Sequence, residues 1–470
     1  MQSNCFRGRV RFGLAFVTVI ALTCNAVRAQ EIVYTTFGDF PNSAPLRVSS
    51  SMFSPDGTKA ALPATQNGQE FMSVNGQPGP LFDRLIRYAF AWTGGNRIVY
   101  FGERGGKELC VVDGKETPLA GRIYRFAPVV AVSADGSRFA YVETTQRQKR
   151  LVLDGKPRSW HSGVGYFQFG AQSKHYRYVI YDGREVSAVI NETKQAVFDG
   201  VTNLFVSDDG KVVGYLAELK DGSYPIINGK IGRRIESVRD FVISPDGRNL
   251  LISEYRLSAL TGSLLLTLNG KSILPPLAEN AILYDVKFSA DSKRYGFAYP
   301  SNEIGDFAVW VDNKSIAFPG YVLGSFQFSP LSTHYVFLGS DTQSGTVTLH
   351  LNGVLLSSHD SIRLGSIAFS SDESKLLYIA EELNGTQAVY VDGKLLGVPY
   401  KSIVSAKFLA DGKVAYLAKN DANEIFLVVG AKVVKVEFEA ISERIDVVNG
   451  KVVVFGRIGT RLLKGEISLQ

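Results

Sequence analysis

One segment of the chain, Val132–Lys156, reads VSADGSRFAYVETTQRQKRLVLDGK. It opens with a first signature, in which a hydrophobic residue, a small polar residue and Asp-Gly occur in close succession. An alternating run, a polar loop and a second apolar run follow, and the segment ends on a second signature, Leu-Asp-Gly-Lys. Alternation and enrichment in Val, Tyr and Phe predict strands. Asp-Gly predicts tight hairpin turns, because Asp and Gly tolerate positive φ angles.

Both signatures recur along the chain. Clear copies of the first are FSPDG (Phe53–Gly57), VSDDG (Val206–Gly210) and ISPDG (Ile243–Gly247), and altered copies begin at Phe288, Phe369 and Phe408. The second signature has its Asp or Asn at Asn75, Asp113, Asp154, Asn191, Asn228, Asn269, Asp312, Asn352 and Asp392. Consecutive positions are 38, 41, 37, 37, 41, 43, 40 and 40 residues apart. This spacing predicts about ten units, and the tail predicts part of an eleventh.

The pattern of each unit predicts a four-stranded antiparallel meander. Such a meander has two exposed faces and cannot bury its apolar side chains by itself. Stacking meanders around an axis buries both faces, so the sequence predicts an all-β fold of β-propeller blades; an open solenoid is the alternative. Since a ring usually has about 4–8 blades, ten or eleven units favour two tandem propellers within 30–470, with a boundary somewhere in 258–285. The segment Glu31–Gly38 is expected to complete a blade begun at the C-terminus.

Residues 1–29 have the pattern of a signal peptide. Arg7, Arg9 and Arg11 precede the apolar run Phe12–Thr23, and Val27-Arg28-Ala29 fits a cleavage site. The sequence therefore predicts a periplasmic or secreted protein with no transmembrane segment in the mature chain; a retained membrane anchor is the alternative. A lipoprotein attached through Cys24 is disfavoured by the threonine before it.

Charge and cysteine content exclude some classes of function. The chain has 51 basic and 45 acidic residues, and removal of the signal leaves 47 against 45. The sequence shows no basic cluster, which argues against nucleic-acid binding. Cys110 would be the only cysteine left, so no intrachain disulfide is expected, and its apolar surroundings favour a small buried core residue.

The FSPDG turn followed by an apolar strand resembles the WD40-like repeat of the TolB-type propeller family, over nearly all of the mature chain. The resemblance implies a periplasmic propeller that binds envelope proteins and has no catalytic residues. The chain departs from that family in having more repeats and no additional N-terminal α/β domain. The repeat also resembles propellers of prolyl oligopeptidase-like enzymes, but no G-x-S-x-G motif occurs and the repeats leave no room for a hydrolase domain.

No residue of the sequence predicts a catalytic, cofactor-binding or metal site. The five histidines are not paired at metal-ligand spacing. Trp160, His161, Tyr166 and Phe167 lie near the join of two units, where aromatic side chains usually form core and less often stack on a ligand. Carboxylates from different blades can still converge, so a propeller glycosidase or lyase remains the alternative function.

The loops between the second and third strands of each unit vary in length and charge, as binding loops on a rigid scaffold do. We expect them to share one face and to bind a protein partner, with a glycan as the alternative ligand. Arg104, Arg147 and Lys149 are the candidate contact residues. No cofactor is expected.

Overall fold

The computed structural model describes residues 32–40, 48–125, 129–170, 172–257, 262–274, 277–278, 281–301, 306–341, 344–382 and 384–468. The predicted signal peptide and the loop 258–261 therefore lie outside the described residues. Described residues form strands and three short 3-10 helices, η1 (Ser50–Met52), η2 (Gly94–Asn96) and η3 (Leu364–Ser366). Within these ranges, no helix is long and apolar enough to cross a membrane.

The strands form eleven antiparallel sheets, which we call blades 1 to 11. Blades 1 to 5 are β2(Ala61–Gln66), β3(Gln69–Val74), β4(Gln77–Pro78); β5(Arg84–Thr93), β6(Arg97–Arg104), β7(Lys107–Val112), β8(Lys115–Pro118); β9(Arg122–Ile123), β10(Ala131–Val132), β11(Phe139–Thr144), β12(Lys149–Leu153), β13(Lys156–Pro157); β14(Gly163–Phe169), β15(Tyr176–Asp182), β16(Glu185–Ile190), β17(Thr193–Phe198); and β18(Gly200–Val206), β19(Val213–Leu219), β20(Gly222–Ile227), β21(Lys230–Ile231).

Blades 6 to 11 continue in chain order. They are β22(Ser237–Ile243), β23(Leu250–Leu257), β24(Gly262–Leu268), β25(Lys271–Ser272), β26(Leu277–Ala278); β27(Tyr284–Phe288), β28(Tyr295–Pro300), β29(Phe307–Val311), β30(Lys314–Phe318); β31(Gln327–Phe328), β32(Tyr335–Asp341), β33(Thr346–Leu351), β34(Val354–His359); β35(Ser361–Ile362), β36(Ala368–Phe369), β37(Leu376–Glu381), β38(Gln387–Val391), β39(Lys394–Tyr400); β40(Ser402–Phe408), β41(Val414–Lys419), β42(Ile425–Val429), β43(Lys432–Val436); and β44(Ala440–Val448), β45(Lys451–Ile458), β46(Arg461–Ser468) with β1(Val33–Asp39).

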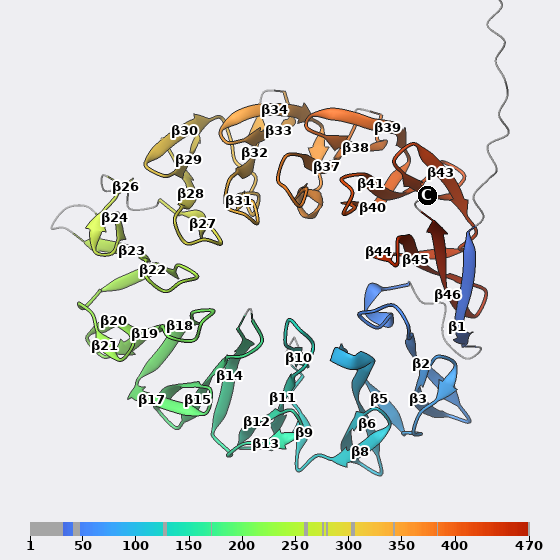
Figure 1. Ribbon diagram of the computed structural model, residues 1–470. Helices are drawn as coiled ribbons and strands as arrows, with labels where there is room; N and C mark the ends of the chain where they lie inside the picture. Colours follow the sequence, from blue (N-terminus) through green and yellow to red (C-terminus); the bar gives the residue numbers. More distant parts are fainter. Residues whose placement is uncertain are drawn as a thin grey trace, which may run out of the picture.

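The blades form one ring (Figure 1). Consecutive blades touch through their inner strands, for example β18 with β22, β22 with β27 and β27 with β31, and β44 of blade 11 meets η1 of blade 1. The prediction of a β-propeller is confirmed. The expected division into two tandem propellers is not seen: contacts continue from blade 6 to blade 7 across 258–285. Turn signals specify a blade but not the rotation between neighbouring blades, so the blade count was a poor guide to the number of rings.

The ring is closed by the two ends of the described chain. β1 pairs antiparallel with β46, from Val33 opposite Glu466 to Asp39 opposite Arg461. β1 is thereby the outermost strand of blade 11, whose other three strands come from the C-terminal end of the chain (Figure 1). The predicted closure by Glu31–Gly38 is confirmed, with the strand beginning at Val33.

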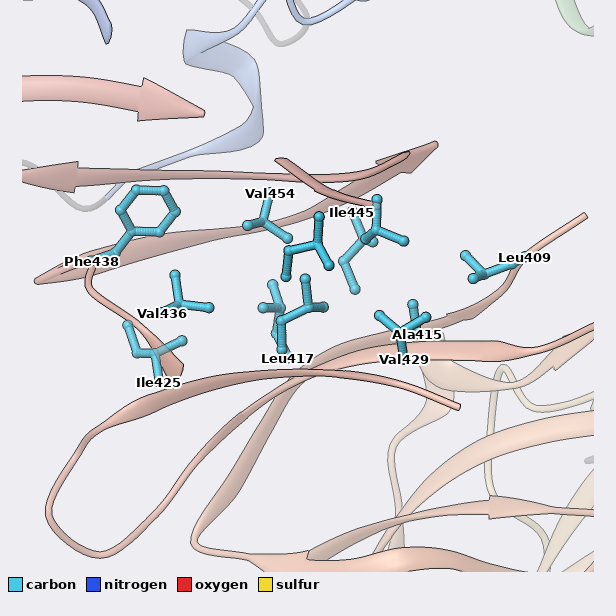
Figure 2. Packing of buried hydrophobic residues seen from close by; sticks show 12 residues of the cluster. Leu409, Ala415, Leu417, Ile425, Val429, Val436, Phe438, Ile445 and Val454 are labelled. Carbon is cyan, nitrogen blue, oxygen red and sulfur yellow. The ribbon is translucent and has the colours of Figure 1, made fainter. Parts of the chain in front are cut away.

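The core lies between blades. Figure 2 shows the contact of blades 10 and 11, where Leu417 and Ile425 of one sheet pack toward Val454 and Ile445 of the next. Leu417 is fully buried and Ile425 is 3% exposed. Because each sheet buries an apolar face against each neighbour, stability comes from these repeated inter-blade contacts.

Turn residues explain both signatures. In the second signature the Asp or Asn has φ near 50° and its side chain accepts the N–H that begins the blade's second strand, as in Phe139 N to Asp154 Oδ1 at 3.0 Å. In the first, the Ser hydroxyl donates to the Asp, as from Ser244 to Asp246 at 2.6 Å. That serine also accepts the N–H of Asn249 at 2.9 Å. Both signatures therefore lie at the same end of every blade that carries them.

Replacing Phe37 of β1 by alanine tests the closure. Phe37 is 8% exposed and its ring lies 5.4 Å from Phe53 of blade 1 and 6.3 Å from Phe455 of blade 11. We expect Phe37→Ala to lower the free energy of unfolding by about 3 kcal/mol, because it leaves a cavity where three segments meet. Val33→Ala in the same strand, at a residue 58% exposed, should change it by less than about 0.5 kcal/mol. Equal denaturation midpoints for the two variants would contradict this role of β1.

Candidate functional site

The ring has two distinct faces. Antiparallel strands reverse direction at each turn, so the link between the first two strands and the link between the last two emerge on one side. These are the signature turns, and we call this side the turn face. Hairpins between the second and third strands, and the links from blade to blade, emerge on the opposite side, which we call the loop face. The predicted variable loops therefore do share one face.

Arg104 is the last residue of β6 and lies on the loop face, but its guanidinium is bound by other residues of this chain. It donates two hydrogen bonds to Glu116, each 2.9 Å, and two to the carbonyl of Leu81, at 2.9 and 2.7 Å. The guanidinium also lies 4.8 Å from the ring centre of Phe82. The bonds to Glu116 raise the pKa of Arg104 above its ordinary value. Arg104 therefore has an evident role in joining blades 1 and 2.

Arg147 and Lys149 belong to the next loop of the same face. Arg147 is exposed in the hairpin between β11 and β12, and Thr145 fixes this hairpin by accepting the N–H of Gln148 at 3.0 Å. The Lys149 ammonium lies 3.6 Å from the ring centre of Tyr124. Two of the three predicted contact residues thus lie together on blade 3.

Blade 3 and its link to blade 4 add further side chains to this place. The Arg150 guanidinium lies 4.5 Å from the ring of Trp160 and forms an ion pair of 2.7 Å with Glu143. His161 pairs with Asp182 at 3.0 Å. The backbones of Lys149 and His161 exchange two hydrogen bonds, of 2.8 and 2.9 Å, which hold the hairpin against the link.

We call Tyr124, Arg147, Lys149, Arg150, Trp160 and His161 the aromatic–basic cluster. Trp160 and Tyr124 are half-buried, so part of each ring is accessible to a ligand next to the cation that it contacts. Tryptophan, tyrosine and arginine are the residues that most often dominate binding energy at protein interfaces. The sequence indicated Arg147, Lys149, Trp160 and His161 separately, but the pairing of β11 with β9 and the link 158–162 bring them together.

The innermost strands carry exposed residues at β-bulges. Tyr166 of β14 has φ of 54° and is 67% exposed, at a bulge where pairing shifts between Gly165 and Gln168. Asn203 of β18 lies at the matching bulge with φ of 51°. A bulge interrupts the alternation of faces and redirects a side chain. The expectation that Tyr166 forms core is therefore wrong, whereas Phe167 packs on the core of blades 3 and 4.

A pocket of about 390 Å³ lies on the turn face where blades 10, 11 and 1 meet. Its lining includes Pro55, Asp56, Lys407, Leu409, Val447 and Val448. The Lys407 ammonium donates to the carbonyl of Ile445 at 2.7 Å, and Arg444 donates to the carbonyls of Ser54, at 2.7 Å, and Pro55. Val447 and Val448 are 40% and 41% exposed. The pocket thus combines an apolar wall with charged groups at the closure of the ring.

Other reactive groups are few in the described parts of the chain. No group of three or more His, Cys, Asp or Glu side chains lies close enough there to hold a metal ion. Cys110 is 3% exposed, as predicted for a core residue, and burial raises its pKa to about 12. A thiol with so high a pKa is a poor nucleophile at neutral pH.

Comparison with known proteins does not assign this chain to a family. No family model matches the chain, and no curated protein matches its sequence. Among solved structures, a eukaryotic initiation factor has 12% identity and a TM-score of 0.42, over 74% of this chain and 96% of that one. The β-propeller domain of the Trilobed protease from Pyrococcus furiosus has 14% identity and a TM-score of 0.31, over 58% and 94%. The Dos1 propeller has 11% identity and a TM-score of 0.32, over 73% and 92%.

Carboxylates of the turn face should make stability fall in acid. Hydrogen bonds from the Ser370 hydroxyl and the Ser374 N–H lower the pKa of Asp372 to about 2, and those from Lys211 and Ser207 do the same for Asp209. A lowered pKa contributes stability above the unfolded value of about 3.9, and this contribution is lost as the pH falls toward 2. We expect the double variant Asp209→Asn/Asp372→Asn to show a smaller fall in its thermal unfolding midpoint between pH 4 and pH 2 than the unsubstituted protein. Parallel pH profiles would refute this assignment.

Proposed function

We propose that this chain is an exported, non-enzymatic β-propeller that binds a protein partner through its loop face. The observation that carries the proposal is the aromatic–basic cluster on blades 3 and 4. It offers two cation–aromatic pairs, Lys149 with Tyr124 and Arg150 with Trp160, beside the exposed Arg147. Export is supported by the predicted signal peptide in residues 1–29.

The cluster is held in place before any partner arrives. The backbone bonds between Lys149 and His161 join two loops, and the ion pair with Glu143 fixes Arg150. Glu143 is 3% exposed, so this pair is largely shielded from solvent. Preorganised side chains lose little conformational entropy on binding, which leaves more of the contact energy for affinity.

The chemistry of the cluster favours a partner surface with acidic and apolar groups. Arg147 and Lys149 attract carboxylates, while the half-buried rings of Tyr124 and Trp160 provide flat apolar area with a polar edge. In an exported protein this partner would be another protein of the cell envelope or of the surroundings.

Site-specific photocrosslinking in the producing cells tests the proposal. A benzoylphenylalanine at position 147 should give a covalent adduct with a defined protein, which mass spectrometry identifies. Lys149→Glu should weaken binding of that purified partner by roughly thirtyfold, corresponding to about 2 kcal/mol for a central interface residue. Trp160→Ala should have a similar effect.

Lys230→Glu provides the matched control, because Lys230 is an exposed lysine of blade 5 next to its turn on the turn face. It should leave partner affinity unchanged, and a benzoylphenylalanine there should give no adduct with the same protein. An identified partner that binds Lys149→Glu and Trp160→Ala as tightly as the unsubstituted protein, with all three folded, would overturn the proposal.

A further inference from the structure

Blade 11 has no first signature and lacks the six-residue turn found in blades such as 6 and 7. In blade 6 six residues link Ile243 to its partner Leu250, and in blade 7 six residues link Phe288 to Tyr295. In blade 11 only Asn449 and Gly450 link Val448 to Lys451. Their φ angles of 50° and 72° fit a tight hairpin. The turn face therefore has a shorter turn where the ring closes.

At complete junctions the longer turns bind one another. The amide of the signature Asp donates to a serine hydroxyl of the next turn, from Asp246 to Ser292 at 2.9 Å and from Asp291 to Ser332 at 3.1 Å. The bond from Asp135 to Ser173, 2.9 Å, repeats this contact between blades 3 and 4. Each such serine stands at the glycine position of the signature, so a serine there is an acceptor as well as a turn residue.

Blade 10 has a signature turn, Phe408–Gly412, but no matching turn follows it. Its signature residue Asp411 is next to Ala410, which lines the pocket. On the far side the pocket is bounded by Pro55 and Asp56 of the blade 1 turn. The pocket thus occupies a position between two turns that corresponds to the place of the blade 7 turn between the turns of blades 6 and 8.

We propose that this pocket binds a β-turn of a partner protein, with an Asp followed by Ser or a similar acceptor, which takes the position of the turn that blade 11 lacks. The hydroxyl of the serine in such a turn would accept a hydrogen bond from the backbone N–H of Asp411. The apolar side of the same turn would lie on Val447 and Val448. Lys407 lines the same pocket together with Asp56 and Asp446, and Asp446 is already paired with Arg444. The Lys407 ammonium, which donates to the carbonyl of Ile445 at 2.7 Å, has further donor capacity for the carboxylate of the incoming Asp. This site lies on the turn face and does not depend on the loop-face proposal.

A cyclic peptide taken from the chain itself tests the inference. The probe has the sequence of blade 7, Phe288–Tyr295 (FSADSKRY), closed to hold its turn. Isothermal titration with the full chain should give a 1:1 complex with a Kd of about 1 mM or lower. The same peptide with alanine in place of its second serine should bind at least about tenfold more weakly, because it lacks the acceptor for Asp411.

Two protein variants locate the binding. In the first, Asn449-Gly450 is replaced by the six residues Ser289–Arg294, which gives blade 11 the missing turn and should abolish binding. In the second, Ala410→Trp fills the pocket and should weaken binding at least about tenfold. Ala134→Trp is the control, because Ala134 is exposed at the same turn position of blade 3. It should bind the probe normally.

The outcomes are decisive even if the grafted chain does not fold, since Ala410→Trp and Ala134→Trp then carry the comparison. No binding of the cyclic peptide at millimolar concentration would overturn the proposal, and so would equal binding by both tryptophan variants. Equal binding of free serine or aspartate would show a small-molecule pocket instead, which would also overturn it.

Discussion

Each blade of this protein has two apolar faces that the blade cannot cover by itself. At the contact of blades 10 and 11, Leu417 and Leu427 are fully buried in one cluster with Val452 and Val454 of the next sheet. Every blade depends in the same way on two neighbours, so an end blade would leave one face in water. A closed ring removes both ends. The pairing of β1 with β46 meets that constraint through backbone hydrogen bonds, because it builds the last blade from both ends of the described chain.

The sequence predicted the blades well because blades are specified locally. Asp392 shows why: its side chain accepts the N–H of Leu376 at 2.8 Å while its backbone adopts φ of 49°. Both requirements are met by Asp or Asn before Gly, so the signal survives in nearly every repeat. The number of rings is not specified locally. It depends on the rotation between sheets, which the shapes of many packed side chains determine together, and no short motif records it.

The candidate site residues also differ in how far local sequence specifies their surroundings. The placement of Arg147 and Lys149 on one face was predictable because loops between the second and third strands must share a face, whereas their role as contact residues stays a prediction. Arg104 was predicted with them, yet its hydrogen bonds to Glu116 and to the carbonyl of Leu81 give it a structural role within the protein. No spacing in the sequence indicates that role. Tyr166 was misjudged because the bulge in β14 reverses the alternation on which the prediction of core rested.

Bulges recur on the innermost strands for a physical reason. These strands have one edge paired and the other facing the axis of the ring, where free backbone groups would invite further pairing. Pairing shifts in β5, β14, β18, β22, β27, β40 and β44 break that edge at seven places in the described chain. The same device exposes a side chain at the axis, so protection of the edge and presentation of Tyr166 and Asn203 come from one backbone feature.

Departures from the repeat are therefore more informative about function than the repeat itself. A signature turn that meets its neighbour, as Asp291 meets Ser332, is fully explained by the stability of the ring. Blade 11 has no such turn, although its four-stranded sheet and its core follow the rule of the others. The carbonyls of Ser54 and Pro55 are instead bound by Arg444, which secures the closure without filling the space between the turns. The ring thus closes through β1, through the packing of Phe53 on Phe455 and through Arg444. The absent turn leaves the pocket in which we propose that a turn of another chain binds.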